Sequence, residues 1–237
     1  SFYTGVAEGN TNAERLITML NVVDGNLVIE EKGIYSVEKF LMARRFMYWQ
    51  VYLHKTAVVA ERLLISILKR ARSLIEKGET LVCSQALDYF LTHHIDINNF
   101  DSDTLEKFAK LDDVDILAAL KEWQNSSDFV LSALCEMIIH RKLLHIKVKK
   151  DPISDSKFLI QQNKVKKRYN LTDEEASYFV FKGELKNKAY DREHQTINIL
   201  RKNGKITDVA KLSDHLNLNA LSKTVTKYYM CYPKEGV

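Results

Sequence analysis

The longest periodic pattern of apolar and polar positions in the chain runs from Ser36 to Gly78. In its second half, apolar residues recur every three or four positions, which is typical of a helix with one buried face. Ser36 is suited to the N-cap of a helix, and Gly78 is a residue at which helices commonly end. The pattern therefore predicts one very long helix, which at 1.5 Å per residue would reach roughly 60 Å.

Shorter elements are predicted on both sides of this helix. Residues 10–23 carry Leu16, Ile17 and Leu20 at helical spacing, and residues 26–33 have a strand pattern that ends at Gly33. After Gly78, helical spacing behind Ser or Asp caps recurs in four segments: residues 83–93, 102–111, 113–123 and 126–144.

From residue 144 onward, strand patterns become common. Residues 144–152 alternate apolar side chains with lysines, a helix is predicted from Ser154, and Thr172 and Glu175 form a capping box. Alternation then recurs in residues 177–187, in 196–210 with an Asn203-Gly204 turn, and in 227–234. We expect a mainly α fold, with a helical part over residues 1–144 that contains the very long helix and a small α+β lobe over 145–237.

Composition narrows the class of protein. The sequence has no run of about 18 uncharged apolar residues and no signal-peptide pattern, so we expect a cytoplasmic protein without membrane spans. Cys83, Cys135 and Cys231 are far apart and lack CxxC spacing, which favours free thiols. The chain starts "SFYTG" without a methionine, and we expect it to be a fragment of a longer protein.

Charge is segregated along the chain. Residues 96–128 contain nine acidic residues and three lysines, whereas residues 141–170 contain ten Lys or Arg and two Asp. The two segments could face each other within a lobe or between subunits, or the basic one could bind a polyanion. Solvated charged faces are the simpler explanation.

Motifs for a catalytic centre are missing from these residues. HExxH, GxSxG, GxxxxGK[ST] and GxGxxG do not occur, and the one dense histidine set is His93-His94 with Asp96. Neighbouring side chains on a helix point about 100° apart, so these two histidines are badly placed to bind one ion. The residues indicate no catalytic or metal site in this chain.

One stretch suits a nucleotide. Arg44, Tyr48, Tyr52 and Lys55 would fall within roughly 80° of one another on a helix. A guanidinium matches phosphate oxygens, and tyrosine offers a flat face and a hydroxyl to a base or sugar. Alternatively, Arg44 and Lys55 pair with carboxylates while the tyrosines pack in the core, and composition alone favours this alternative.

The segment GIYSVEKFLMARRFMYWQVYLHKTAVVAERLL, residues 33–64, resembles the long helix of HD-domain deoxynucleoside triphosphate triphosphohydrolases. In that family an arginine is followed, after seven residues, by Tyr-x-His-Lys, which matches Arg44, Tyr52, His54 and Lys55 here. Three later stretches resemble the family in the same order: residues 108–123, 138–148 and 177–191.

This resemblance implies a metal-dependent hydrolase that releases deoxynucleoside and triphosphate from dNTPs. It implies that Arg44 contacts substrate phosphate and that Tyr52 lies under the deoxyribose. The family includes a vertebrate enzyme that carries a SAM and an HD domain. Tyr48 falls where this vertebrate enzyme has a histidine, and Leu53 where it has a glutamine. The divalent metal and its His and Asp ligands would belong to chain upstream of Ser1, so residues 1–237 alone are expected to be inactive.

Regulated members of the family also bind nucleotides between subunits, which implies a homo-oligomer, either a dimer or a tetramer. Six residues fall near such regulatory positions: Arg15, Lys32, His54, Lys55, Arg141 and Lys182. Glu30 stands where the vertebrate enzyme has a further arginine, so the same regulation is not implied.

Two alternatives remain. The basic segment could bind single-stranded nucleic acid through Lys164, Lys166, Lys167 and Arg168, with Phe158 and Tyr169 nearby. Otherwise the chain could be an oligomerisation module of an HD protein that acts on another phosphoester, because fold alone does not choose the substrate.

Overall fold

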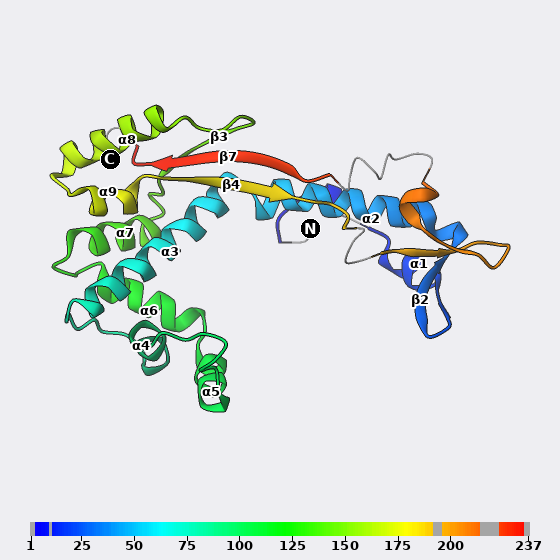
Figure 1. Ribbon diagram of the computed structural model, residues 1–237, viewed down its shortest axis with the longest axis horizontal. Coiled ribbons are helices and arrows are strands. Elements are labelled where there is room, and N and C mark those ends of the chain that lie inside the picture. The colour runs from blue at the N-terminus through cyan, green and yellow to red at the C-terminus, as the bar shows by residue number, and fades with distance from the viewer. Residues whose placement is uncertain (1–2, 10, 192–195, 214–222, 235–237) are drawn as a thin grey trace. The chain divides into compact units, whose positions relative to one another are not determined.

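The computed structural model describes residues 3–9, 11–191, 196–213 and 223–234, and this part of the chain is mainly helical with two small sheets (Figure 1). Ser1, Phe2 and Asn10 lie outside the described residues. The chain forms two compact units: residues 1–57 with 184–228 (unit 1), and residues 58–183 with 229–237 (unit 2). Each unit therefore contains residues from both sides of position 144. Compactness does not show which parts fold alone, so the domain boundary at 144 stays a prediction.

Unit 1 begins with the short 3-10 helix η1 (Ala7–Gly9) and α1 (Ala13–Ile17). A hairpin follows, formed by β1 (Leu20–Val23) and β2 (Asn26–Glu30), so the prediction of helix through residue 23 is wrong. Asp24 and Gly25 both have positive φ, 51° and 74°, as a tight Asp-Gly hairpin turn requires. This turn, together with the strand-favouring pair Val22 and Val23, outweighs the helical spacing of the apolar residues.

The sheet of unit 1 brings together segments far apart in sequence. Its order is β1-β2-β5-β6, with β5 (Asn198–Leu200) parallel to β2 and β6 (Ile206–Asp208) antiparallel to β5. The Asn203-Gly204 turn joins β5 to β6, as predicted, and the 3-10 helix η4 (Val209–Lys211) follows.

The predicted very long helix is two helices with an interruption between them. After the 3-10 helix η2 (Glu31–Gly33), α2 covers Ile34–Met47, a π-helical turn covers Tyr48–Tyr52, and α3 covers Lys55–Glu76. The Leu53 N–H donates to the Tyr48 carbonyl at 2.7 Å, five residues back. His54 then caps α3, because its Nδ1 accepts a hydrogen bond from the Thr56 N–H at 3.3 Å. No proline or glycine marks this interruption, which is why the sequence does not reveal it.

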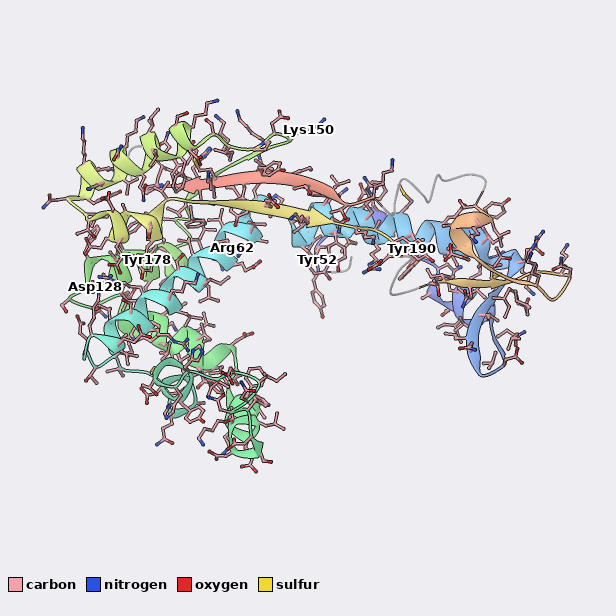
Figure 2. The ribbon with its side chains drawn as sticks, in the orientation of Figure 1. Tyr52, Arg62, Asp128, Lys150, Tyr178 and Tyr190 are labelled. Atoms are coloured by element: carbon pink, nitrogen blue, oxygen red, sulfur yellow. The ribbon has the colours of Figure 1, made fainter. Side chains whose placement is uncertain are left out.

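The core of unit 1 packs α2 against the later part of the chain. Val37 and Leu41 of α2 belong to one buried cluster with Tyr190, Ile199 and Val209. The Tyr190 hydroxyl donates to Asp208 and accepts from the Ile197 N–H at 2.9 Å, so this buried phenol is fully bonded (Figure 2).

Unit 2 consists of helices that mostly start where the capping residues predict. After α3 come six helices and one strand: α4 (Gln85–Thr92), α5 (Ser102–Lys110), α6 (Asp113–Trp123), α7 (Phe129–Ile139), β3 (His145–Lys149), α8 (Asp155–Tyr169) and α9 (Asp173–Phe179). The predicted capping box of Thr172 and Glu175 is confirmed at the start of α9. Helix α7 ends at Ile139, before the predicted residue 144, and Arg141 has a φ of 55°.

A second sheet has the order β3-β7-β4, with β4 at Phe181–Asn187 and β7 at Val225–Tyr232. Both β4 and β7 contribute residues to each unit. The three cysteines are free thiols, as expected, and burial raises the pKa of Cys135 and of Cys231 to about 12. Within the described residues, no helix has the length and apolar character needed to cross a bilayer.

Candidate functional site

A hollow of about 360 Å³ lies along α2 in unit 1, and we call it the α2 hollow. Its lining consists of Gly9, Thr11, Phe40, Ala43, Arg44, Met47, Tyr48 and Tyr52. The three residues predicted to bind substrate, Arg44, Tyr48 and Tyr52, thus share one surface. Lys55 does not line the hollow, because the π-helical turn changes the angular spacing after Tyr48.

The polar groups of the α2 hollow lie within reach of a single ligand. The guanidinium carbon of Arg44 is 5.7 Å from the centre of the Tyr48 ring, which is a cation–π distance. The rings of Tyr48 and Tyr52 are 5.3 Å apart with planes inclined at 51°. A cation at one end and two aromatic faces beside it can bind phosphate and a flat ring together.

The structure also tests the alternative in which Arg44 and Lys55 form ion pairs with carboxylates and the two tyrosines pack in the core. Neither Arg44 nor Lys55 contacts a carboxylate in the part of the chain that is described. Tyr52 is 62% exposed, and Tyr48 is half-buried. That alternative is therefore wrong for Arg44, Lys55 and Tyr52.

The π-helical turn presents its side chains in two directions. Tyr48 and Tyr52 line the α2 hollow, whereas Trp49 packs under Lys227 of β7, whose Nζ is 3.9 Å from the ring centre. Sequence reasoning missed Thr11 and Phe40 as lining residues. Phe40 lies four residues before Arg44, a spacing that could have included it.

The six candidate regulatory residues are divided between the units. Arg15, Lys32, His54 and Lys55 belong to unit 1 and Arg141 and Lys182 to unit 2, and none of the first four lines the α2 hollow. Lys32 pairs with Glu30 at 2.8 Å, and Lys182 pairs with Asp155 at 2.5 Å. A role for these residues in nucleotide binding stays a prediction.

Several residues of the predicted nucleic-acid surface have contacts within the fold. Tyr169 packs against Phe129 and Phe179, with ring centres 5.7 and 6.1 Å away. Lys166 pairs with Asp173 at 2.7 Å, and Arg168 donates to the Lys234 carbonyl at 3.2 Å. These contacts leave Tyr169 little freedom to stack on a base.

The residues described offer no group of three or more His, Cys, Asp or Glu side chains that could bind a metal ion. His93, from the histidine pair noted in the sequence, interacts instead with a nearby residue of α4, the helix that it follows. The His93 ring stacks on Tyr89 at 4.4 Å, and its Nδ1 lies 3.0 Å from the Tyr89 carbonyl oxygen.

Residues 11–89 match the family model of the HD associated region. This match contains α2, the π-helical turn and α3, and so includes Arg44, Tyr48 and Tyr52. A Bacillus subtilis protein, YwfO, is 29% identical over 99% of this chain and 53% of its own length.

Solved structures share the fold over almost the whole chain. A phosphohydrolase from Bacteroides thetaiotaomicron matches with a TM-score of 0.91 and 46% identity, over 99% of this chain and 59% of that one. A hypothetical protein from Aquifex aeolicus matches with a TM-score of 0.61 at 22% identity, over 98% of this chain and 50% of that one, which shows the fold alone. The chain therefore spans about half the length of these relatives, and the matches link it to HD-type proteins.

Proposed function

We propose that this chain is part of an HD-type phosphohydrolase that hydrolyses deoxynucleoside triphosphates to deoxynucleoside and triphosphate. The observation that carries the proposal is the α2 hollow, because Arg44, Tyr48 and Tyr52 line it together. The phosphohydrolase of similar structure supports the reaction class. The dNTP substrate rests on the resemblance of the Arg44 to Lys55 motif.

In this function the three residues have distinct roles. Arg44 binds a phosphate oxygen and neutralises charge that develops as the ester bond breaks. Tyr48 offers its ring to the sugar or base. Tyr52 places its ring under the deoxyribose, where a 2′-hydroxyl would meet it.

A divalent metal is implied by the family, and its function when bound would be to activate a water molecule. The described residues do not fit such an ion, since they form no cluster of suitable ligands. We therefore assign no step of the reaction in this chain to a metal, and we propose that its ligands precede Ser1. Residues 1–237 alone are then expected to bind dNTPs without hydrolysing them.

The decisive test is Arg44→Ala in the protein encoded by the complete reading frame that contains this chain. We expect kcat/KM for dNTPs to fall about 10- to 100-fold, because a hydrogen bond to a charged group contributes about 1.5–3 kcal/mol. Arg45→Ala is the matched control, since Arg45 is on the same turn and outside the α2 hollow. It should keep kcat/KM within about twofold.

The same variants distinguish the structural alternative. If Arg44→Ala leaves dNTP hydrolysis unchanged but abolishes oligomer formation in analytical ultracentrifugation, the α2 hollow serves assembly and its proposed role in substrate binding is wrong. Hydrolysis of dNTPs by purified residues 1–237 would contradict the placement of the metal ligands.

A further inference from the structure

A second hollow, in unit 2, has a different chemistry from the α2 hollow. It has a volume of about 210 Å³ and lies among β3, β7 and the start of α8. We call it the lysine hollow, after Lys147, Lys149 and Lys157, which line it with Ser154, Ile160 and Tyr232. In Figure 1, α8 runs beside β3 and β7, and Lys150 marks the turn between β3 and α8 in Figure 2.

The spacing of the lysines explains why they meet. Lys147 and Lys149 are two residues apart on β3, so both side chains leave the same face of the strand. Ile146 and Val148 are the half-buried residues that face the other way. Lys157 and Ile160 are three residues apart on α8, which puts them on one side of that helix.

Among the described residues, these three ammonium groups have no counterion. No Asp or Glu lines the lysine hollow, and none of the three lysines has a carboxylate partner within the ranges that the structure describes. Asp155, the acidic residue in the first turn of α8, is held by Lys182 at 2.5 Å, and this hydrogen bond lowers its pKa. Lys166, further along α8, does pair with an aspartate, Asp173, at 2.7 Å.

The start of α8 adds to the positive potential. Ser154 is the N-cap residue, but its hydroxyl makes no capping hydrogen bond and lies 3.2 Å from the Ser156 hydroxyl. The first N–H groups of this 15-residue helix therefore lack a side-chain acceptor, and the helix dipole favours an anion there.

We propose that the lysine hollow binds the polyphosphate group of a small molecule, either a nucleoside di- or triphosphate or a free oligophosphate. Three lysines supply a charge of +3, which a di- or triphosphate can neutralise and a single carboxylate cannot. Ile160 and Tyr232 form an apolar wall on which a nucleoside can rest. This site does not depend on the function proposed for the α2 hollow.

The test measures binding of sodium tripolyphosphate and of ATP by calorimetry to the full chain and to two triple variants. The first combines Lys147→Gln, Lys149→Gln and Lys157→Gln, which removes the charges but keeps a polar side chain at each position. The control combines Lys110→Gln, Lys121→Gln and Lys167→Gln, which changes the net charge equally at exposed lysines outside both hollows. All six positions are exposed, and unchanged circular dichroism will show that the variants fold.

We expect tripolyphosphate to bind the first variant at least tenfold more weakly, and the control within about twofold of the unchanged chain. An equal loss in both variants would show diffuse charge attraction and overturn the proposal, as would no loss in either. Weaker binding in Arg44→Ala with unchanged binding in the first triple variant would assign the ligand to the α2 hollow and overturn the proposal too.

The comparison of the two ligands identifies what the site binds. If ATP binds more tightly than tripolyphosphate and Tyr232→Ala removes the difference, the ligand is a nucleotide. Equal affinities would identify the phosphate chain alone.

Discussion

Gly183 of β4 lies directly against the side chain of Tyr229 of β7. A Cβ added at this position would be 2.6 Å from the Tyr229 hydroxyl oxygen and 2.8 Å from the adjoining ring carbons. Tyr229 is 3% exposed, and its burial raises the pKa of the phenol. The ring has no solvent into which it can turn, so the absence of a side chain at Gly183 is needed for packing.

Gly183→Ala should therefore destabilise the protein. We expect a loss of about 1–3 kcal/mol in the free energy of unfolding, measured by urea denaturation, because overpacking displaces the buried ring. Glu184→Ala changes the adjacent, exposed residue and should cost less than about 0.5 kcal/mol. Equal stability of the two variants would show that the ring moves aside at no cost.

At the scale of elements, a buried arginine joins three helices of unit 2. Arg70 of α3 donates to both carboxylate oxygens of Asp128, at 3.0 and 2.5 Å, and lies 3.8 Å from Glu175 of α9. Its guanidinium is also 5.5 Å from the ring centre of Tyr178. Asp128, labelled in Figure 2, in turn caps α7. It accepts from the Leu131 N–H at 2.8 Å, so one carboxylate both starts a helix and holds the arginine.

This pair should make the stability of unit 2 depend on pH. Burial acts to raise the pKa of Asp128, but the hydrogen bonds from Arg70 and Leu131 outweigh it and the pKa is lowered. A lowered pKa in the folded state stabilises the protein above the ordinary Asp pKa of about 3.9, and this contribution is lost as the pH falls through the lowered value. The free energy of unfolding should thus decline below about pH 4.

Asp128→Asn should reduce stability near pH 7 by up to about 3–5 kcal/mol, because the buried Arg70 loses its bidentate carboxylate partner and keeps only the longer contact of 3.8 Å with Glu175. The acid limb of the stability curve should also become flatter, which urea denaturation at several pH values will measure. Asp113→Asn, at an exposed position in α6, should leave both quantities nearly unchanged. If the stability of Asp128→Asn declined below pH 4 as steeply as that of the unchanged protein, groups other than Asp128 would cause the decline.

At the scale of the whole molecule, the core of unit 1 depends on residues at both ends of the chain. Val37 and Leu41 share their buried cluster with Tyr190, Ile199 and Val209, and β2 pairs with β5. Burying these side chains gives about 1.5–3 kcal/mol each, so neither segment has a complete core without the other.

Separate expression of residues 1–144 and 145–237, the two parts predicted from the sequence, tests this dependence. We expect neither part to unfold cooperatively on its own, as followed by circular dichroism on heating, whereas the full chain should. Two cooperative transitions in the separate parts would instead support the boundary at residue 144.

Local interactions account for the elements that sequence predicted well. The helices of unit 2 begin where Ser, Asp or Thr caps precede apolar spacing, because the cap and the first turns involve only neighbouring residues. For the same reason, the spacing of Arg44, Tyr48 and Tyr52 was sufficient to predict that they share a face.

Tertiary structure decided what depends on residues distant in sequence. The interruption at Tyr48–Tyr52 contains no proline or glycine that would mark it, and its Trp49 packs under Lys227, 178 positions later. The parallel pairing of β2 with β5 likewise has no local signal. Sequence by itself thus determined the residue types available for binding phosphate, and the packing of remote segments decided which of them share a hollow.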